Sequence, residues 1–294
     1  MRHPFERSPS FVPMTVESAG EFDALLREAM REDIGPGDLT TDAVIPPGAV
    51  ATADVVIRSR GVLAGLGVAL RSIELLDSTV VFEQRIADGA RVAAGASVAR
   101  VRGAARAILS GERVALNLLG RLCGIATLTR AYVDAVDGYT ARITDTRKTT
   151  PGLRVLERYA VRAGGGVNHR FGLYDAVLIK DNHIAAIGSI GEAIARARAA
   201  APAGTIIEAE CDTLDQVRAA LAAHVDSILL DNMTVEAMSE AVRLTRGAAI
   251  VEASGGVNLS TVRAVAATGV DVISLGALTH GATSLDVALD FLLG

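Results

Sequence analysis

Lysine is almost absent from this chain. The sequence contains 27 arginines but only two lysines, Lys148 and Lys180, although either residue type can serve as an ordinary surface cation. The ammonium of lysine is a compact, strongly hydrated point charge, whereas the guanidinium of arginine is a planar fork. The two lysines are therefore candidates for catalysis or anion binding. The alternative is that a biased composition has retained them by chance.

Other scarcities exclude whole classes of protein. Two cysteines, Cys123 and Cys211, are too few for a disulfide framework and fit a reducing cytoplasm. No apolar run reaches the length of about 18 residues that a membrane span requires. The formal net charge of −5 disfavours generic nucleic-acid binding, so a polyanionic ligand must be bound by a local cluster of cations. Residues 1–16 lack the apolar segment of a secretory signal, and we expect them to form a loosely held, flexible extension.

The first part of the chain predicts a small α+β domain. Residues 104–137 contain no proline and have apolar residues at helical spacing, which predicts one or two helices leading out of that domain. The elements expected before them are an amphipathic helix at 17–32, a short helix near 66–76 and strands at 51–59, 79–86 and 97–103.

From residue 141 onward, short apolar runs alternate with helical patterns. This alternation predicts parallel strands joined by crossover helices, in a doubly wound sheet or a barrel. Charged, amide or glycine residues follow every run, as expected where the loops of a barrel converge on one site, so we favour an incomplete barrel. The six expected strands are 141–144, 175–179, 205–210, 226–230, 248–253 and 270–275.

A set of cations falls at or near the ends of these strands. If they converge, they form a cationic pocket suited to a substrate with several phosphates or carboxylates. The alternative is a set of scattered, solvated charges. The members are Arg147, Lys148, His169, Arg170 and Lys180.

Glu210 and Asp231 end two neighbouring strands in phase. Carboxylates placed in this way can share a hydrated Mg²⁺ ion or bind ribose hydroxyls, although they can also be ordinary strand-end charges. Asp181 is a further candidate. Glu208 is expected on the opposite face of its strand or in a salt bridge.

Small residues follow the last two strands and predict a site for a monophosphate, with tight ligand-free turns as the alternative. These residues are Ser254, Gly255, Gly276 and His280.

Several remaining polar residues are expected to be structural. His3, His183 and His224 lack the spacing of metal ligands, and Cys123 is expected to pack as a small hydrophobe. Arg154, Arg158 and Arg162 are four residues apart, which predicts one exposed face of a helix at 152–163.

The segment DTRKTTPGLRVLERYAVRAGGGVNHRFGLYDAVLIKDNHI (145–184) resembles the signature of the quinolinate phosphoribosyltransferase family, also called carboxylating nicotinate-nucleotide pyrophosphorylases. The resemblance extends over about residues 17–294. Cys123 stands where the family often has serine, and Ala163 where it often has cysteine. Further matching blocks, in the family's order, are REDIGPGDLTTD (31–42), GERVALNLLGRLCGIAT (111–127), EAECDTLDQ (208–216), ILLDNM (228–233), EASGGV (252–257) and SLGALTH (274–280).

The resemblance implies an N-terminal α/β sandwich at 17–116, with a C-terminal helix at 284–294 packing back on it. It also implies an open α/β barrel at 117–283, with the site at the C-terminal ends of its strands. The implied activity is that of a pentosyltransferase that joins quinolinate to phosphoribosyl pyrophosphate with Mg²⁺. The products would be nicotinate mononucleotide, pyrophosphate and CO₂, in de novo NAD biosynthesis. The implied assembly is a homodimer.

The resemblance also implies roles for individual residues. Arg147, His169 and Arg170 would bind the dicarboxylate together with Arg113, which would reach the neighbouring subunit's site. Lys148 and Lys180 would meet pyrophosphate and carboxylate charge, while Glu210 and Asp231 would hold ribose hydroxyls and the metal-bound donor. Such catalysis consists of positioning and electrostatic stabilisation, with no separate cofactor for decarboxylation.

Three other functions are compatible with the pattern. The first is a related pyridine phosphoribosyltransferase acting on nicotinate or nicotinamide, although one carboxylate fewer should need fewer cations. The second is a barrel lyase or aldolase in which Lys148 or Lys180 forms a Schiff base, which would require a dry pocket. The third is a non-catalytic nucleotide sensor.

Overall fold

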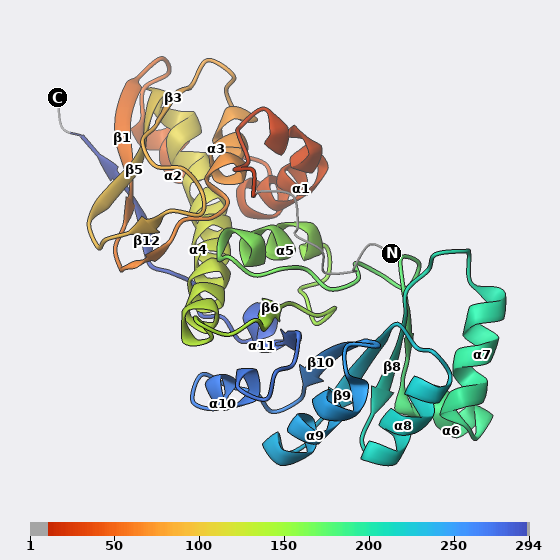
Figure 1. Cartoon of the computed structure of the whole chain (residues 1–294). Helices are drawn as coiled ribbons and strands as arrows, with labels where there is room; N and C mark the ends of the chain where they lie inside the picture. The colour runs from red at the N-terminus through yellow and green to blue at the C-terminus, as the bar shows by residue number, and fades with distance from the viewer. Residues whose placement is uncertain (1–10, 293–294) are drawn as a thin grey trace. The chain divides into compact units, whose positions relative to one another are not determined.

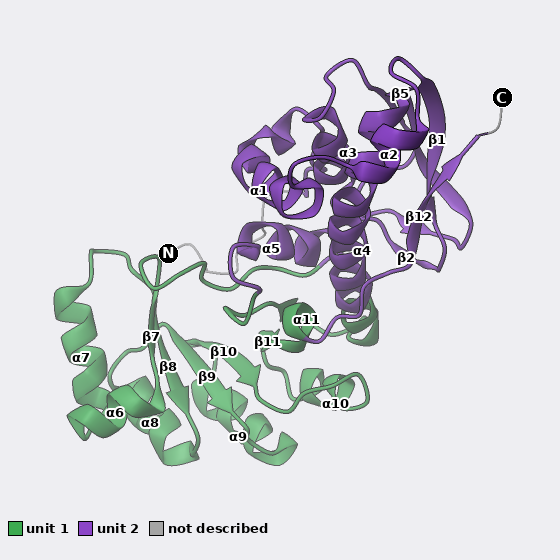
Figure 2. Ribbon diagram, turned by 180° about the vertical axis from the view of Figure 1, so that it is seen from behind, with its two compact units in different colours: residues 1–8, 131–149, 166–280 green, residues 9–130, 150–165, 281–294 purple. Residues whose placement is uncertain are grey.

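The structure, a computed structural model, describes residues 11–292, which divide into two compact units (Figures 1 and 2). Of the described residues, unit 1 comprises 131–149 and 166–280, and unit 2 comprises 11–130, 150–165 and 281–292. Within residues 11–292, no helix combines the length and the apolarity needed to cross a bilayer.

Unit 2 is an α/β sandwich built on an antiparallel sheet of four strands in the order β12-β1-β5-β3. Apolar side chains of β1 and β5 form one core with those of α3 and α4, including Ile57, Leu70, Val98 and Leu119. Its elements are η1 (Ser18–Phe22), α1 (Asp23–Ile34), α2 (Leu39–Val44), β1 (Val50–Ile57), β2 (Gly61–Val62), α3 (Leu66–Glu74), β3 (Val81–Gln84), β4 (Arg91–Val92), β5 (Ala96–Ala104), α4 (Ala105–Ala135, ending in unit 1), α5 (Arg154–Ala163) and β12 (Val287–Phe291).

The prediction of a helix at 284–294 is wrong for the described part of that segment. Residues 287–291 form strand β12, which pairs antiparallel with β1 so that Leu289 lies opposite Val55. Val287 and Leu289 pack against the sandwich core, and an apolar residue at every second position is the pattern of a strand. Residues 293–294 lie outside the described residues.

The prediction of a loosely held extension at 1–16 is wrong for residues 11–16, while residues 1–10 lie outside the described part. Met14 is buried, and its backbone N–H donates to the hydroxyl of Tyr159 at 2.8 Å. The ring of Phe11 lies 5.2 Å from that of Tyr159, centroid to centroid. Tyr159 also donates to the buried carboxylate of Asp88 at 2.6 Å, so the segment is anchored to the interior of unit 2.

The predicted exposed arginine face of the helix at 152–163 is also wrong. Arg158 is only 8% exposed, and Arg154 and Arg162 are partly buried. Helix α5 buries residues around most of its circumference, including Glu157, which accepts a hydrogen bond from Arg121 at 2.9 Å. Long arginine stems can be buried in this way when their charged ends find polar partners.

Both cysteines are buried free thiols, and burial raises the pKa of each to about 12. A thiol with such a pKa stays protonated and unreactive at neutral pH. Cys123 lies in the sandwich core, as predicted.

Unit 1 is an open α/β barrel, as predicted. Its six strands are parallel and lie in the order β6-β11-β10-β9-β8-β7, so β6 and β7 form the two edges of the sheet. All six predicted strands are present. The elements are β6 (Arg142–Thr144), β7 (Val177–Ile179), α6 (Asp181–Ile187), α7 (Ile190–Ala200), β8 (Ile207–Cys211), α8 (Leu214–Ala222), β9 (Ser227–Asp231), α9 (Val235–Thr245), β10 (Ile250–Ser254), α10 (Val262–Ala266), β11 (Val272–Ser274) and α11 (Ala277–His280). The predicted domain boundary between 116 and 117 falls inside α4 and stays a prediction.

Candidate active site

The C-terminal ends of the unit 1 strands surround a cavity of about 600 Å³, which we call the main cavity. Eleven of the twelve residues predicted from the sequence line it, from positions that follow or end β6, β7, β8, β9, β10 and β11. Their side chains and backbones come from distant parts of the chain because parallel strands end at the same edge of the sheet. The eleven are Arg147, Lys148, His169, Arg170, Lys180, Glu210, Asp231, Ser254, Gly255, Gly276 and His280.

The twelfth predicted residue, Arg113, does not line the main cavity. It lies on α4 in unit 2, beside a separate hollow of about 260 Å³ that Asn117, Ser284 and Asp286 also line. Its predicted contribution to a neighbouring subunit's site therefore stays a prediction.

At the base of the main cavity, His169 lies between two buried carboxylates. Its Nε2 is 3.1 Å from Oε2 of Glu208 on β8 and 3.3 Å from Oε2 of Glu252 on β10. We call these three residues the His169 cluster. Glu208 thus forms a salt bridge, one of the two placements expected for it.

Glu252 was not among the predicted residues, although the sequence contains a signal for it. Glu208 stands two residues before Glu210 in β8, and Glu252 stands two residues before Ser254 in β10, and both strands belong to the same sheet. Residues two apart in a strand point to the same face, so both glutamates were candidates for the interior of the barrel.

The electrostatics of the His169 cluster favour an imidazolium. Burial on its own lowers the pKa of His169, but Glu252 and Glu208 together outweigh this effect and raise the pKa to about 10. Burial is also the main cause of a raised pKa at Glu252, with the Glu208 charge adding to it and His169 opposing it. His169 therefore carries a proton at neutral pH.

Hydrogen bonds to Asp145 fix the loop that carries His169. This carboxylate is fully buried and accepts from the backbone N–H of His169 at 2.8 Å and from the Asn168 amide at 2.6 Å. The guanidinium of Arg170, the next residue, donates to the carbonyl of Ala176 at 3.1 Å. The histidine and the arginine are thus held in place before any ligand binds.

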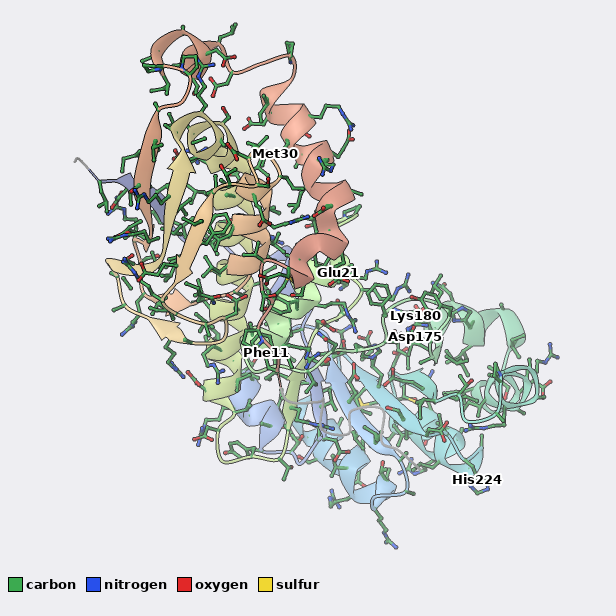
Figure 3. All side chains as sticks on the ribbon, turned by 90° about the horizontal axis from the view of Figure 1, so that it is seen from above. Phe11, Glu21, Met30, Asp175, Lys180 and His224 are labelled. Atoms are coloured by element: carbon green, nitrogen blue, oxygen red, sulfur yellow. The ribbon has the colours of Figure 1, made fainter. Side chains whose placement is uncertain are left out.

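Lys180 and Glu210 form an ion pair in the lining of the main cavity, with 3.6 Å between Nζ and Oε2. Burial is the main cause of a raised pKa at Glu210; Lys180 opposes it, while Asp231 and Asp181 add to it. Lys180 lies directly after β7 and Asp175 shortly before it, and Figure 3 labels both. The backbone N–H of Lys180 donates to Nδ1 of His183 at 2.9 Å, which confirms a structural role for that histidine.

Two glycines keep space open on the side of the cavity formed by the last strands. Gly255 has φ = +86°, and a Cβ there would lie 2.2 Å from Oδ1 of Asn232. A Cβ on Gly276 would lie 2.8 Å from Cδ of Lys148 and 3.3 Å from Nε2 of His280. Side chains at these positions would therefore displace residues that line the main cavity.

One group of carboxylates in unit 1 could hold a divalent metal ion. Ligand oxygens of Glu210, Asp212 and Asp231 lie within 4.8 Å of one another. Carboxylate oxygens completed by water and phosphate suit Mg²⁺. The raised pKa of Glu210 reflects in part the repulsion that a cation at this place would relieve.

Family models match most of the chain. The model described as quinolinate phosphoribosyl transferase, N-terminal domain, matches residues 38–123, and the model for the C-terminal domain matches residues 125–290.

Curated relatives match over nearly the whole length. A probable nicotinate-nucleotide pyrophosphorylase (carboxylating) of Bacillus subtilis is 48% identical over 266 residues, which cover 90% of this chain and 92% of the relative. A nicotinate-nucleotide pyrophosphorylase (carboxylating) of Mycobacterium leprae is 47% identical, covering 92% of this chain and 98% of its own.

Solved structures share the fold. The crystal structure of NadC from Streptococcus pyogenes superposes with a TM-score of 0.90 at 43% identity, covering 93% of this chain and 98% of that one. The nicotinate-nucleotide pyrophosphorylase from Francisella tularensis superposes with a TM-score of 0.89 at 35% identity, covering 97% and 100% of the two chains.

Proposed function

The chain belongs to the quinolinate phosphoribosyl transferase family, and on that premise we propose that it transfers phosphoribosyl from phosphoribosyl pyrophosphate to quinolinate. The products are nicotinate mononucleotide, pyrophosphate and CO₂, which makes the reaction a step of de novo NAD biosynthesis. The observation that carries the proposal is the convergence of eleven predicted residues on one cavity of about 600 Å³.

The charge of the main cavity suits these substrates. Five cationic side chains line it, counting the imidazolium of His169, against three carboxylates. Quinolinate has two carboxylates, and the donor has a monophosphate and a pyrophosphate. The cavity must therefore bind several anionic groups at once, which an excess of cationic side chains favours. Charge–charge contacts inside a partly enclosed cavity are stronger than the same contacts in bulk solvent.

Separate parts of the cavity would bind separate parts of the substrates. Arg147 and Arg170 would hold the dicarboxylate ring, assisted by the positive charge of His169. Ser254, Gly255, Gly276 and His280 would bind the 5-phosphate of the sugar, as supported by the space that the two glycines leave open. Lys148, next to Gly276, would meet the pyrophosphate as it leaves. These contacts align the ring nitrogen with the anomeric carbon.

We propose that Mg²⁺ is the metal cofactor. Glu210 and Asp231, with Asp212 near them, supply the oxygen ligands that it prefers, and phosphate oxygens and water would complete its shell. When bound, the ion neutralises charge on the pyrophosphate leaving group. The same two carboxylates would hold the ribose hydroxyls and stabilise the positive charge that develops on the sugar.

The decisive assay mixes the protein with quinolinate, phosphoribosyl pyrophosphate and Mg²⁺. We expect equimolar CO₂ and nicotinate mononucleotide, and omission of Mg²⁺ should suppress both. Failure of the folded protein to form either product would contradict the proposal. Because a non-catalytic nucleotide sensor would bind the donor without turnover, the same assay excludes that function.

A Schiff-base lyase is the alternative from another class. Lys180 is half exposed and lies beside Glu210, whereas a Schiff-base lysine needs a dry pocket that lowers its pKa. Borohydride added with substrate should therefore leave the mass of the protein unchanged, and a covalent adduct on Lys148 or Lys180 would favour the lyase.

We also propose that the enzyme is a homodimer in the cytoplasm, with Arg113 of one subunit completing the other subunit's site. The proposal is supported by the fact that Arg113 lines a separate hollow of unit 2 and is not among the residues that line the main cavity. A 1:1 mixture of Arg113→Ala and Lys148→Ala subunits should regain about a quarter of wild-type activity, since half of the dimers then contain one intact site. A mixture that stays inactive after subunit exchange would show that Arg113 does not act in trans.

A further inference from the structure

His169 borders two cavities in unit 1. Besides the main cavity it lines a second cavity of about 240 Å³, which we call the rear cavity. Asn168, Glu208 and Ser227 are polar residues of this rear cavity, and it reaches residues near the N-terminal ends of β8 and β9. Arg170 is the other residue that lines both. The imidazole therefore stands at the boundary between the proposed substrate site and a separate cavity.

The ring is held by contacts that fix both its position and its protonation state. Glu208 and Glu252 lie at 3.1 and 3.3 Å from Nε2, and Ser227 donates to the other oxygen of Glu208 at 2.8 Å. Because these two carboxylates raise the pKa of His169 to about 10, the ring carries a proton on each nitrogen at neutral pH.

The proposed reaction requires one proton on a ring carbon. When the ring nitrogen has bonded to the sugar and pyrophosphate has left, the bond from C2 to its carboxylate breaks and CO₂ departs. The bonding electron pair stays on C2, next to the positive nitrogen. C2 must then take up a proton, so the overall reaction consumes one proton for each CO₂ released.

Among the cations of the main cavity, His169 is the best placed donor. The guanidinium groups of Arg147 and Arg170 hold their protons too tightly to act as acids. Lys180 faces Glu210 and its side chain is half exposed, so its proton is in contact with an anion and with solvent. His169 alone combines an acidic N–H with access to the rear cavity, through which it can be reprotonated while substrates fill the main cavity.

We propose that His169 is the general acid that protonates C2 after decarboxylation, with Glu208 and Glu252 as its positioning residues. One N–H bond of the imidazolium breaks, the proton forms the new C2–H bond, and the electrons of the broken bond remain on the neutral imidazole. The imidazole then takes a proton from water in the rear cavity. The inference rests on the proposed function, since it concerns a step of that reaction.

The reverse of this step gives a direct test. In D₂O, the enzyme with nicotinate mononucleotide alone should exchange the C2 hydrogen for deuterium, because neutral His169 can remove the proton that His169 donates during turnover. The exchange, followed by NMR, should be at least ~100-fold slower in His169→Gln, which keeps an amide near the two carboxylates but has no titratable proton. Calorimetry of nucleotide binding checks that the variant still forms the complex.

A matched control removes an imidazole elsewhere in unit 1. His224 is exposed (labelled in Figure 3) with φ = +55°, a conformation that asparagine tolerates. His224→Asn should therefore exchange at the wild-type rate. An exchange rate in His169→Gln equal to that of the wild type would overturn the proposal, as would a wild-type rate no higher than that of the nucleotide without enzyme.

If His169→Gln does not fold, Glu252→Gln provides the test. Glu208 on β8 and Glu252 on β10 contact the ring, and Asp145 accepts from the backbone N–H of His169. The other charged groups nearest in the two cavities are Arg170 and Asp175 beside the rear cavity and Arg147 and Lys148 in the main cavity. Removing the charge of Glu252 lowers the pKa of the imidazolium, so neutral imidazole forms at lower pH. The midpoint of the exchange rate against pH should fall, and an unchanged midpoint would contradict the proposal.

Failure of this inference differs from failure of the proposed function. If CO₂ and nicotinate mononucleotide form but C2 exchange does not depend on His169, the function stands and the acid is another group. If neither product forms, the proposed function itself fails.

Discussion

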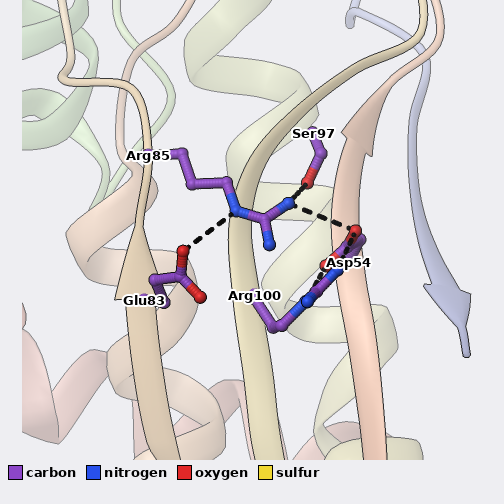
Figure 4. Close-up of polar contacts among 5 residues, drawn as sticks. All are labelled: Asp54, Glu83, Arg85, Ser97 and Arg100. Atoms are coloured by element: carbon purple, nitrogen blue, oxygen red, sulfur yellow. Dashed lines mark hydrogen bonds and ion pairs between the residues drawn. The ribbon is translucent and has the colours of Figure 1, made fainter.

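Each of the two units contains a cluster in which cationic and anionic side chains pair, but the two clusters differ greatly in their exposure to solvent. In unit 2, the Asp54 carboxylate accepts from Arg100 at 2.7 and 3.0 Å and from Arg85 at 3.3 Å, and Arg85 also contacts Glu83 and Ser97 (Figure 4). These side chains span β1, β5 and the end of β3, and several are partly exposed. In unit 1, the His169 cluster is almost wholly buried at the base of a cavity.

This difference separates charges that a fold tolerates from charges that a function requires. A partly exposed pair costs little and contributes little, typically about 0–1 kcal/mol. Buried charges cost several kcal/mol to desolvate, and apolar residues could fill the same volume at lower cost. The charged groups of the main cavity are therefore best explained by a ligand, whereas those in Figure 4 need no ligand.

The largest expected effect comes from Lys148. Lys148→Ala should lower kcat/KM by ~10³-fold, because it removes a cation that stabilises charge in the transition state. Lys148→Arg should not restore activity, since a planar fork does not replace a compact ammonium next to Gly276. Steady-state kinetics and thermal melts measure both effects, and the melting temperature should stay near that of the wild type. Arg218→Ala, which removes an exposed cation of α8, is the control and should be as active as the wild type. Full activity in Lys148→Ala would remove that residue from the site.

Gly276→Ala tests whether small residues position the lysine. Its Cβ would lie 2.8 Å from Cδ of Lys148, so the side chain must move. A displacement of this size should lower kcat/KM by ~10²-fold with little loss of stability. Gly191→Ala in α7, where the nearest atom is 3.8 Å away, is the matched control and should be slightly more stable than the wild type and equally active. Unchanged kinetics in Gly276→Ala would show that the close contact has no functional role.

Tyr159→Phe should lower the stability of unit 2 and leave catalytic activity unchanged. The change removes the hydroxyl that donates to Asp88 and accepts from Met14, and Asp88 is 5% exposed, with burial as the main cause of its raised pKa. Losing a partner of a buried carboxyl should lower the free energy of unfolding by about 1–3 kcal/mol, as measured by urea denaturation. Residues 11–16 should also become more accessible to protease. An unchanged unfolding midpoint would mean that this contact does not anchor the segment.

Asp54→Asn should have the smallest effect. Hydrogen bonds from Arg100 are the main cause of a lowered pKa at Asp54, so the carboxylate stabilises the fold at pH 7 by about 1 kcal/mol. For a lowered pKa, this stability is present above the unfolded value of about 3.9 and is lost as pH falls through the folded value. Urea denaturation at pH 7 should therefore separate variant and wild type, and the difference should shrink below about pH 4. A loss of enzyme activity in Asp54→Asn would break the contrast between the two units.

Most of the fold could be predicted from the sequence because its elements have strong periodic patterns. The six strands of unit 1 are apolar runs separated by helices, and parallel strands place their polar C-terminal residues at one edge. This rule located eleven residues of the main cavity. Strand β12 was missed because a five-residue strand in DVALDF resembles part of a helix until its partner, β1, is known.

The missed features depend on neighbours that no local pattern reveals. Glu208 on β8 and Glu252 on β10 both contact His169, although β9 lies between their strands. Only the order of the strands in the sheet shows that these two side chains point to the same interior. Likewise, Arg158 has the spacing of a solvent-exposed residue, and only the packing of α5 within unit 2 shows that it is buried.

The central claim is that the charged main cavity recognises two carboxylates on one ring. The most direct test compares kcat/KM for quinolinate and for nicotinate, with the same donor and the same mononucleotide product. A site built to bind a second carboxylate should reject the ring that lacks it by at least ~10³-fold. A ratio near one would contradict the account, because the cations assigned to the second carboxylate would then have no part in recognition.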